Sequence, residues 1–278
     1  MVLYRCSIEE SLTYRSIRAQ DSYSHGLISF LIYDNGPTDQ SENTPSDWMY
    51  VSNPSNGGLP AAYNYALMKA DQGQCNWLLL FDQDSDLPKN FLANLQDQIG
   101  LHDQNPTVAA IVPFVFSNDR QVSPFLPSLG FDRRYGDRDT VVSRWISAIN
   151  SATSVRVSYV KTIGGFSSEF WLDYLDHWLF RKIYSTGYSV FVGNVAIKHN
   201  LSVANFNAGM EISRYKNVLK SEMYFTNHYL SYFAKLALVA RLTARGIKHA
   251  LLTHDKRICQ LMLSAAWKQL VLLFGWVK

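Results

Sequence analysis

Short apolar runs alternate with helical stretches along the first 115 residues of the chain. The apolar runs have the length and density of buried strands, and they cover residues 26–36 (GLISFLIYDNG), 76–81 (NWLLLF) and 108–116 (VAAIVPFVF). The stretches with helical periodicity cover residues 6–20, 61–73 and 89–100. Strand and helix in strict alternation predict an α/β fold with a mostly parallel central sheet and helices on both faces.

The pattern changes twice further along the chain. The segment from Ser117 to Tyr159 is polar and rich in turn residues, which indicates loops with some strand. From Val218 to Ala244, and again from Ile258 to Val277, the chain is helical in pattern. We therefore expect a domain over residues 1–210, in two parts (1–115 and 116–210), followed by a C-terminal helical extension over 211–278.

Composition excludes several classes of protein. Apolar residues make up 47% and charged residues 18% of the chain, as in ordinary globular proteins. A formal net charge of +3 does not favour nucleic acid as a partner. The three cysteines are scattered without disulfide or metal-ligand spacing, which suits a reducing compartment, and we expect a cytoplasmic protein. Neither a secretory signal nor an uninterrupted spanning segment is visible.

The acids after the second apolar run are the first sign of chemistry. Asp82 and Asp84 follow the predicted strand at alternate positions, so their side chains leave its end on the same side. Asp34 ends the preceding strand, and ligands of α/β sheets bind beyond such ends. Mg²⁺ uses one or two carboxylates and takes further oxygens from substrate phosphates. The pair fits a nucleotide-phosphate site, although many strand-end acids only cap a helix, as we expect of Asp86.

Four segments in this order resemble family 2 glycosyltransferases with the GT-A fold, most closely the bacterial rhamnosyltransferase branch. They are DNG at 34–36, NPSNGGLPAAYNYAL at 53–67, LLLFDQDSDLP at 78–88 and GGFSSEFWLDYLDHWLFRKIYSTGY at 164–188. The resemblance covers roughly Val2 to Leu201, and it implies that residues 1–115 bind the nucleotide sugar and that residues 116–210 form the acceptor side. It implies an inverting, metal-dependent transfer of a sugar, with rhamnose as the leading candidate, from a dTDP- or UDP-sugar to a glycan or lipid-linked acceptor in bacterial surface polysaccharide (O-antigen) synthesis.

The resemblance also assigns roles to residues on the donor side. Asp34 matches the acid that reads the base, and Asp82 and Asp84 match the D-x-D motif, with Asp84 the more direct ligand of Mg²⁺ or Mn²⁺ and Asp82 nearer the ribose. His199 matches a histidine near the metal or diphosphate. The other residues expected to bind the nucleotide sugar are Tyr4, Asn56, Gly57, Asn64 and Gly165.

The catalytic base is expected in the segment FWLDYLDHWLF. The family's base position matches Asp176, with Asp173 as the competitor three residues earlier, on the same face if both lie on one helix. One of the two could instead be a helix N-terminal acid favoured by the dipole. The sequence departs from the family at Trp178, where an acid is frequent, and in its first strand, which is shorter than usual.

Two other functions fit parts of the pattern. Phosphatases of the haloacid dehalogenase type also place D-x-D after an apolar strand, but there the motif opens the domain. A catalytically silent sugar- or nucleotide-binding subunit could use the same fold. The C-terminal segment from Ile258 to Lys278 is apolar with few charges, and two interpretations stay open. It is either a helix packed on the domain or in a homodimer, or an interfacial helix that makes a peripheral contact with the inner face of the plasma membrane.

Overall fold

The structure, a computed structural model, describes residues 1–20, 27–128, 132–199, 212–252 and 256–275. The chain divides into two compact units. The larger unit consists of Met1–Leu126 and Arg134–Leu201, and the smaller one of Pro127–Arg133 and Ser202–Lys278. The domain boundary predicted at residue 210 lies outside the described residues, so it stays a prediction.

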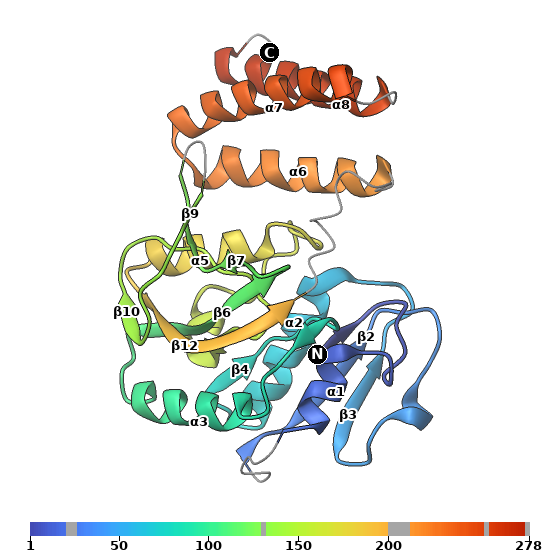
Figure 1. Cartoon of the computed structure of the whole chain (residues 1–278), viewed down its shortest axis with the longest axis vertical. Coiled ribbons are helices and arrows are strands. Elements are labelled where there is room, and N and C mark those ends of the chain that lie inside the picture. The colour runs from blue at the N-terminus through green and yellow to red at the C-terminus, as the bar shows by residue number, and fades with distance from the viewer. Residues whose placement is uncertain (21–26, 129–131, 200–211, 253–255, 276–278) are drawn as a thin grey trace. The chain divides into compact units, whose positions relative to one another are not determined.

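Figure 1 labels the helices and strands of both units. The strands are β1 (Val2–Leu3), β2 (Phe30–Asp34), β3 (Trp48–Ser52), β4 (Trp77–Leu79), β5 (Ser85–Asp86), β6 (Val108–Ser117), β7 (Arg120–Ser123), β8 (Phe125–Leu126), β9 (Arg133–Arg134), β10 (Thr140–Val142), β11 (Ser154–Arg156) and β12 (Ser189–His199). The helices of the larger unit are α1 (Leu12–Arg18), η2 (Ser41–Asn43), α2 (Gly58–Gln72), α3 (Phe91–His102), α4 (Val157–Thr162) and α5 (Leu175–Ser185). The alternation of strand and helix that the sequence predicts is therefore present.

The strands of the larger unit form two main sheets. β1, β2 and β3 are parallel neighbours, in the order β1-β2-β3. The second sheet has the order β10-β12-β6-β11-β4, and in addition β5 pairs with β12 and β7 pairs with β6. The amide of Val2 donates to the carbonyl of Phe81, 2.9 Å away, which links the first strand to the chain just beyond β4.

The prediction of a mostly parallel central sheet is wrong in its strand pairing. In the second sheet only β6 and β12 are parallel neighbours, and the other pairings are antiparallel. Two of these antiparallel pairings are made by β11, a three-residue strand from the segment expected to form loops with some strand. It lies between β4 and β6 and is antiparallel to both, so β4, β6 and β12 still run in one direction.

The two long strands at the centre of this sheet are covered on both faces. In β6 the residues from Val108 to Val115 are all buried, a pattern typical of a strand between two layers. α3 packs against β6 and β12 through Phe91, Leu92 and Leu95. α5 packs against β12 with its own buried residues, and Figure 1 shows it on the other side of these strands from α3.

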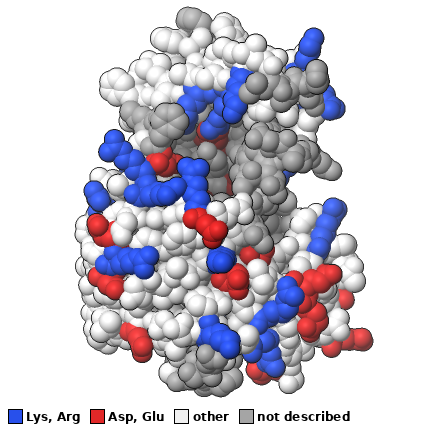
Figure 2. All heavy atoms as spheres, in the orientation of Figure 1, with Lys and Arg blue, Asp and Glu red and all other residues white. Residues whose placement is uncertain are grey.

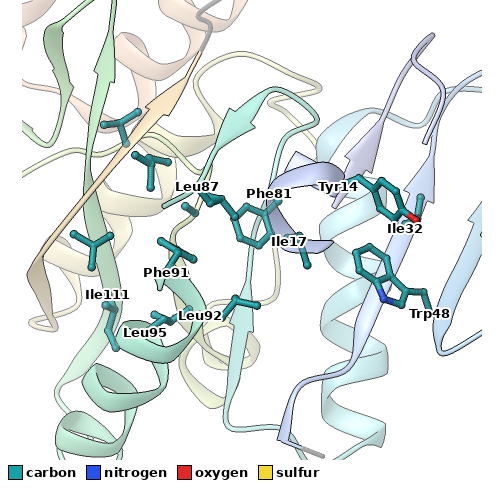
Figure 3. Close-up of a cluster of buried hydrophobic side chains, with 14 of the residues drawn as sticks. Tyr14, Ile17, Ile32, Trp48, Phe81, Leu87, Phe91, Leu92, Leu95 and Ile111 are labelled. Atoms are coloured by element: carbon teal, nitrogen blue, oxygen red, sulfur yellow. The ribbon is translucent and has the colours of Figure 1, made fainter. Parts of the chain in front are cut away.

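The main core cluster links the two sheets. Figure 3 shows α1 and α3 contributing Tyr14, Ile17, Phe91, Leu92 and Leu95 to one apolar layer. The indole of Trp48 stacks on Phe30 at 4.4 Å between ring centroids and meets Tyr14 edge-on at 5.4 Å. Because this layer fixes α1 against the strands, it also fixes the chain that leaves β4.

The start of α1 differs from the expected one. Ser7 and Glu10 do form the reciprocal hydrogen bonds of a capping box, with the Ser7 hydroxyl donating to Glu10 Oε2 at 2.7 Å and the Glu10 amide donating to Ser7 Oγ at 3.2 Å. They close a turn, however, and the helix begins only at Leu12, where Ser11 Oγ accepts a hydrogen bond from the Tyr14 amide. The Ser-x-x-Glu motif alone does not show whether a helix or only a turn begins at the serine.

The smaller unit contains three long helices, α6 (Ile212–Tyr229), α7 (Tyr232–Leu252) and α8 (Lys256–Phe274). Its core consists of buried residues from each helix: Tyr215, Leu219, Leu238, Leu242, Met262, Ala265 and Ala266. The helical stretch expected from Val218 to Ala244 is split between α6 and α7, because Ser231 caps a new helix by accepting from the Ala234 amide. Within the described residues, no helix is long and apolar enough to cross a bilayer.

Candidate active site

The D-x-D segment lies just beyond β4 and is held by polar side chains at the start of α1. Thr13, which is fully buried, donates through Oγ1 to the Asp82 carbonyl at 2.6 Å and accepts from the Ser85 amide at 2.8 Å. Ser11 Oγ donates to the carbonyl of Gln83 at 2.8 Å. These bonds hold the backbone of the segment and leave the carboxylates of Asp82 and Asp84 partly exposed.

The histidine at the end of β12 meets both acids. β5 pairs with β12 so that His199 stands opposite Ser85, and this places the imidazole beside the D-x-D motif. His199 Nδ1 lies 3.5 Å from Asp84 Oδ1, and Nε2 lies 3.9 Å from Asp82 Oδ2. One ligand atom from each of the three side chains falls within 4.8 Å of the others. The fold therefore brings His199 beside Asp82 and Asp84, which lie more than 110 positions earlier in the chain, as the family resemblance implies.

Burial disfavours the ionised form of both acids of the motif. Burial raises the pKa of Asp82 to about 6; His199 lowers it, while the Asp84 and Asp176 carboxylates raise it. Burial also raises the pKa of Asp84, and His199 opposes that shift. A divalent cation would favour the ionised form of both acids. Two carboxylates and one imidazole suit Mn²⁺ and leave coordination positions for phosphate oxygens.

The carboxylate of Asp176 interacts electrostatically with the D-x-D motif. It lies in the first turn of α5, and its carboxylate contributes both to the raised pKa of Asp82 and to that of the buried Tyr63 hydroxyl, after the effect of burial. Its Oδ1 accepts from the His177 amide at 2.7 Å and lies 2.8 Å from His177 Nδ1. The expected base is therefore near enough to Asp82 to affect its ionisation, and its catalytic role stays a prediction.

Asp173 does not share a helical face with Asp176. Tyr174 adopts a left-handed conformation, with φ of 69°, and α5 begins only at Leu175. The two acids would share a face only if both lay on one helix, and that condition is not met because the left-handed residue interrupts the backbone between them. Asp173 lies in the preceding loop, so the two acids do not occupy equivalent positions.

The turn at residues 56–58 is shaped by a neighbouring loop of the protein. Gly58 has φ of 76°, and a Cβ there would collide with the backbone oxygen of Trp171. That oxygen accepts from the Leu59 amide at 2.9 Å, and Trp171 Nε1 donates to the carbonyl of Asn56 at 3.3 Å. Gly58 is thus needed for packing on Trp171. Nucleotide binding by Asn56 and Gly57 stays a prediction.

The side chain of Asn64 is hydrogen-bonded to the G-G-F turn at residues 164–166. Its Nδ2 donates to the Phe166 carbonyl at 2.8 Å, and its Oδ1 accepts from the Phe166 amide at 2.8 Å. A Cβ on Gly165, whose φ is 85°, would lie 2.6 Å from Asn64 Oδ1. Two residues expected to bind the donor sugar, Asn64 and Gly165, are therefore in contact with each other, and the amide of Asn64 holds the turn.

Asp34 is completely buried and bonded within the protein. Oδ1 accepts from the Gly36 amide at 2.7 Å, and Oδ2 accepts from Gln40 Nε2 at 2.8 Å and from the Tyr50 hydroxyl at 3.0 Å. Both carboxylate oxygens thus stabilise the turn after β2. A role in reading the nucleotide base stays a prediction.

Tyr4 lies at the same edge of the fold as the D-x-D segment. Its amide donates to Gln83 Oε1 at 2.8 Å, while its ring is 42% exposed beneath the Arg5 guanidinium, 5.2 Å from the ring centroid. Gln40 connects this edge to Asp34, because its Nε2 also donates to the Cys6 carbonyl at 3.1 Å. The ends of β1, β2 and β4 therefore meet, as the α/β pattern predicts.

Sequence reasoning missed the side chains that support the site. Thr13 and Ser151 hold the backbone at Asp82, and Ser85 contacts both Ser151 and His199 Nδ1, the latter at 3.2 Å. None of them belongs to a recognisable motif. Asp86, which we expected to cap α3, instead accepts a long hydrogen bond from Ser16, and Asn90 occupies the N-cap position.

The fold and this site define the class of protein. The chain has a GT-A-like α/β fold: it superposes on a crystal structure of GalNAc-T7 with UDP, GalNAc and Mn²⁺, with a TM-score of 0.57 and 11% identity. The superposition covers 99% of this chain and 56% of that one. Altogether, 75 chains of solved structures match.

Residues 10–159 match the model of glycosyl transferase family 2. The chain belongs to this family, whose members are nucleotide-sugar-dependent glycosyltransferases. No curated protein sequence matches the chain significantly. The matched range contains Asp34, Asn64 and the D-x-D motif, whereas Asp176 and His199 lie beyond it, so their roles are argued from geometry.

Proposed function

We propose that the chain is an inverting, metal-dependent glycosyltransferase that uses a nucleotide-diphosphate sugar. The observation that carries this proposal is the convergence of Asp82, Asp84 and His199 in one cluster with Asp176 close by. A carboxylate cluster suited to a cation is what a diphosphate donor needs, and a further carboxylate is what an attacking hydroxyl needs.

The transfer requires one proton acceptor and one leaving group. The acceptor oxygen attacks the anomeric carbon, the bond between that carbon and the diphosphate oxygen breaks, and the hydroxyl proton passes to the carboxylate of Asp176. His177 Nδ1, 2.8 Å from Asp176 Oδ1, orients that carboxylate. A cation held by Asp82, Asp84 and His199 would offset the charge of the diphosphate. The nucleoside diphosphate leaves with the electron pair of the broken bond.

The finer identity of the reactants rests on the sequence resemblance alone. It supports rhamnose as the donor sugar, carried by dTDP or UDP, and a glycan or lipid-linked acceptor in bacterial surface polysaccharide synthesis. Such an acceptor would place the enzyme at the cytoplasmic face of a membrane. A homodimer through the C-terminal helices is the other arrangement that the apolar helices α7 and α8 suggest.

A donor screen tests the proposal. The full chain is incubated with a panel of nucleotide sugars, with Mn²⁺ or Mg²⁺, and release of the nucleoside diphosphate is measured. We expect release from one donor, abolished by chelator and by Asp84→Asn. Binding of a nucleotide without any release, across the panel and with acceptor glycans present, would favour the silent binding subunit. Family membership and the GT-A-like fold leave the haloacid dehalogenase alternative without support.

A further inference from the structure

The outer side of α7 is apolar. Phe233, Ile247 and Leu251 are 71%, 52% and 79% exposed. Their spacing places them, with the exposed Ala240 and Ala244, on one face of the helix, because steps of 3, 4 and 7 residues return to the same side. The buried Leu238 and Leu242 lie on the opposite face. A surface helix normally shows the reverse arrangement, with polar residues outward.

α8 repeats this arrangement. Leu263, Trp267 and Phe274 are 40%, 60% and 50% exposed and follow one another at steps of four and seven residues. The residues that face the core of the smaller unit are Met262, Ala265, Ala266 and Gln269. Each helix of the α7–α8 hairpin thus has one face in the core and a second apolar face outside it.

Both outer stripes are turned away from α6. Gly246 of α7 packs directly against Leu263 of α8, where a Cβ would come within 2.9 Å of the leucine side chain, so the Leu263 stripe borders α7. α6 approaches the hairpin from elsewhere: Glu222 of α6 pairs with Arg245 of α7 at 2.8 Å, and Asn227 of α6 exchanges two hydrogen bonds with Gln269 of α8. On helical geometry, the stripes therefore point away from α6. We call them the apolar face; it consists of Phe233, Ile247, Leu251, Leu263, Trp267 and Phe274.

The charge of this region differs in sign from that of the rest of the chain. Residues 202–278 contain 11 Lys and Arg against three Asp and Glu, whereas residues 1–201 contain 15 against 20. In the described residues of α6, α7 and α8 the single acid is Glu222, which is buried and paired with Arg241 and Arg245. In the view of Figure 2, the edge formed by α7 and α8 is largely uncharged, with Lys and Arg side chains beside it.

Lysines flank the apolar face on both helices. Lys248 and Lys268 are exposed and follow Ile247 and Trp267 directly, so each lies about 100° around its helix from the apolar residue that precedes it. A second copy of this chain, docked through the same face, would bring two strongly basic surfaces together, which costs electrostatic free energy. An anionic bilayer instead accepts the apolar side chains among its acyl chains and the lysines among its headgroups.

We propose that the α7–α8 hairpin docks on an anionic membrane surface through the apolar face, lying in the plane of the headgroups with Lys248 and Lys268 toward the lipid phosphates. This contact needs no helix that spans the bilayer. It is independent of the chemistry proposed above, since neither metal nor sugar nucleotide takes part in it.

Flotation of the full chain with lipid vesicles tests the proposal. The vesicles contain phosphatidylcholine alone or with about a third of phosphatidylglycerol, and neither metal nor nucleotide is added. We expect flotation with the anionic vesicles only, weakened at least tenfold by salt near 1 M, where the Debye length falls to about 3 Å. A chain that floats in this way but releases no nucleoside diphosphate would disprove the proposed enzyme and leave the docking surface standing.

Matched variants separate the contributions. Leu251→Ser with Trp267→Ser removes apolar area, and Lys248→Glu with Lys268→Glu reverses the flanking charge; each pair should lower vesicle partitioning about tenfold or more. Leu101→Ser, at a leucine of α3 that is 77% exposed, is the control and should float like the wild type. Circular dichroism of each variant establishes that the helices have formed.

Three results would overturn the proposal. The first is absence of flotation by the wild type with anionic vesicles, and the second is flotation that both paired variants retain in full. The third is a dimer in sedimentation analysis that Leu251→Ser with Trp267→Ser converts to a monomer, because the apolar face would then be covered by a second copy.

Discussion

Asn64 and Phe166 exchange a pair of 2.8 Å hydrogen bonds across 102 positions of sequence, which ties the helix α2 to the G-G-F turn. Asn64→Ala leaves the amide and carbonyl of Phe166 without these partners, at a cost of about 1–3 kcal/mol. We expect a corresponding fall in the free energy of unfolding, measured by urea denaturation. The stability of Asn64→Asp should lie between those of the wild type and of Asn64→Ala, since the aspartate can still accept a hydrogen bond from the Phe166 amide.

Asn217→Ala is the matched control for this effect, because Asn217 is an exposed residue of α6. Equal stability of the Asn64 and Asn217 variants would contradict a structural role for the Asn64–Phe166 pair. It would return Asn64 to the role that the sequence suggested, at the donor sugar.

The D-x-D site shows how much of such a site a sequence can predict. The run of apolar residues up to Phe81, followed by Asp82 and Asp84, is a local pattern, and local patterns locate strand ends well. The support from Thr13 comes from a residue 69 positions earlier, and no spacing rule connects the two. The family resemblance supplied His199 and Asp176, which local patterns alone do not select.

Two differences from the expected structure have backbone causes. β11 was missed because a strand of three residues is too short to show periodicity, and its antiparallel insertion between β4 and β6 changed the pairing of the sheet. The spacing from Asp173 to Asp176 is compatible with one turn of helix, yet Tyr174 is left-handed and the helix starts after it. Neither the rare dihedral of a tyrosine nor a three-residue strand follows from composition.

Mn²⁺ should bind through Asp84 and His199. Asp84→Asn and His199→Gln each remove one ligand of the cluster, so we expect the affinity for Mn²⁺, measured by calorimetry in the absence of donor, to fall at least about tenfold. Asp97→Asn, at an exposed acid of α3, should bind the metal like the wild type. Unchanged Mn²⁺ affinity in both ligand variants would place the metal elsewhere or remove it from the protein.

Asp176, and not Asp173, should act as the base. A positioned general base contributes about 10²–10⁴-fold in rate, so Asp176→Asn should lose activity of that order while the donor nucleotide still binds. Asp173→Asn should have the smaller effect on kcat, because Asp173 lies before the helix and Asp176 is the acid that influences Asp82. The test measures kcat with a saturating donor and the affinity for the nucleotide, for both variants. A larger kcat loss in Asp173→Asn, with affinity intact, would exchange the two roles.

The raised pKa of Asp82 should make the metal-free protein less stable at neutral pH than in mild acid. Its pKa is about 6 in the folded state against an ordinary 3.8, so between these values the folded state holds a proton that the unfolded state has lost. This contribution to stability therefore increases as pH falls from about 6 to 3.8, and above pH 6 the ionised Asp82 costs free energy. Because the side chain is 32% exposed, solvent screens this effect, and we expect it to change the free energy of unfolding by about 1–2 kcal/mol.

Asp82→Asn removes this cost, and the test is urea denaturation of the metal-free wild type and variant at pH 7.5 and pH 4. We expect the variant to be more stable than the wild type at pH 7.5 and to lose most of that advantage at pH 4, where Asp82 is already protonated. Added Mn²⁺ should stabilise the wild type and have less effect on the variant, since a ligand that binds only the folded state adds to its stability. A variant destabilised equally at both pH values would show that Asp82 is held by hydrogen bonds, and that its ionisation carries no cost.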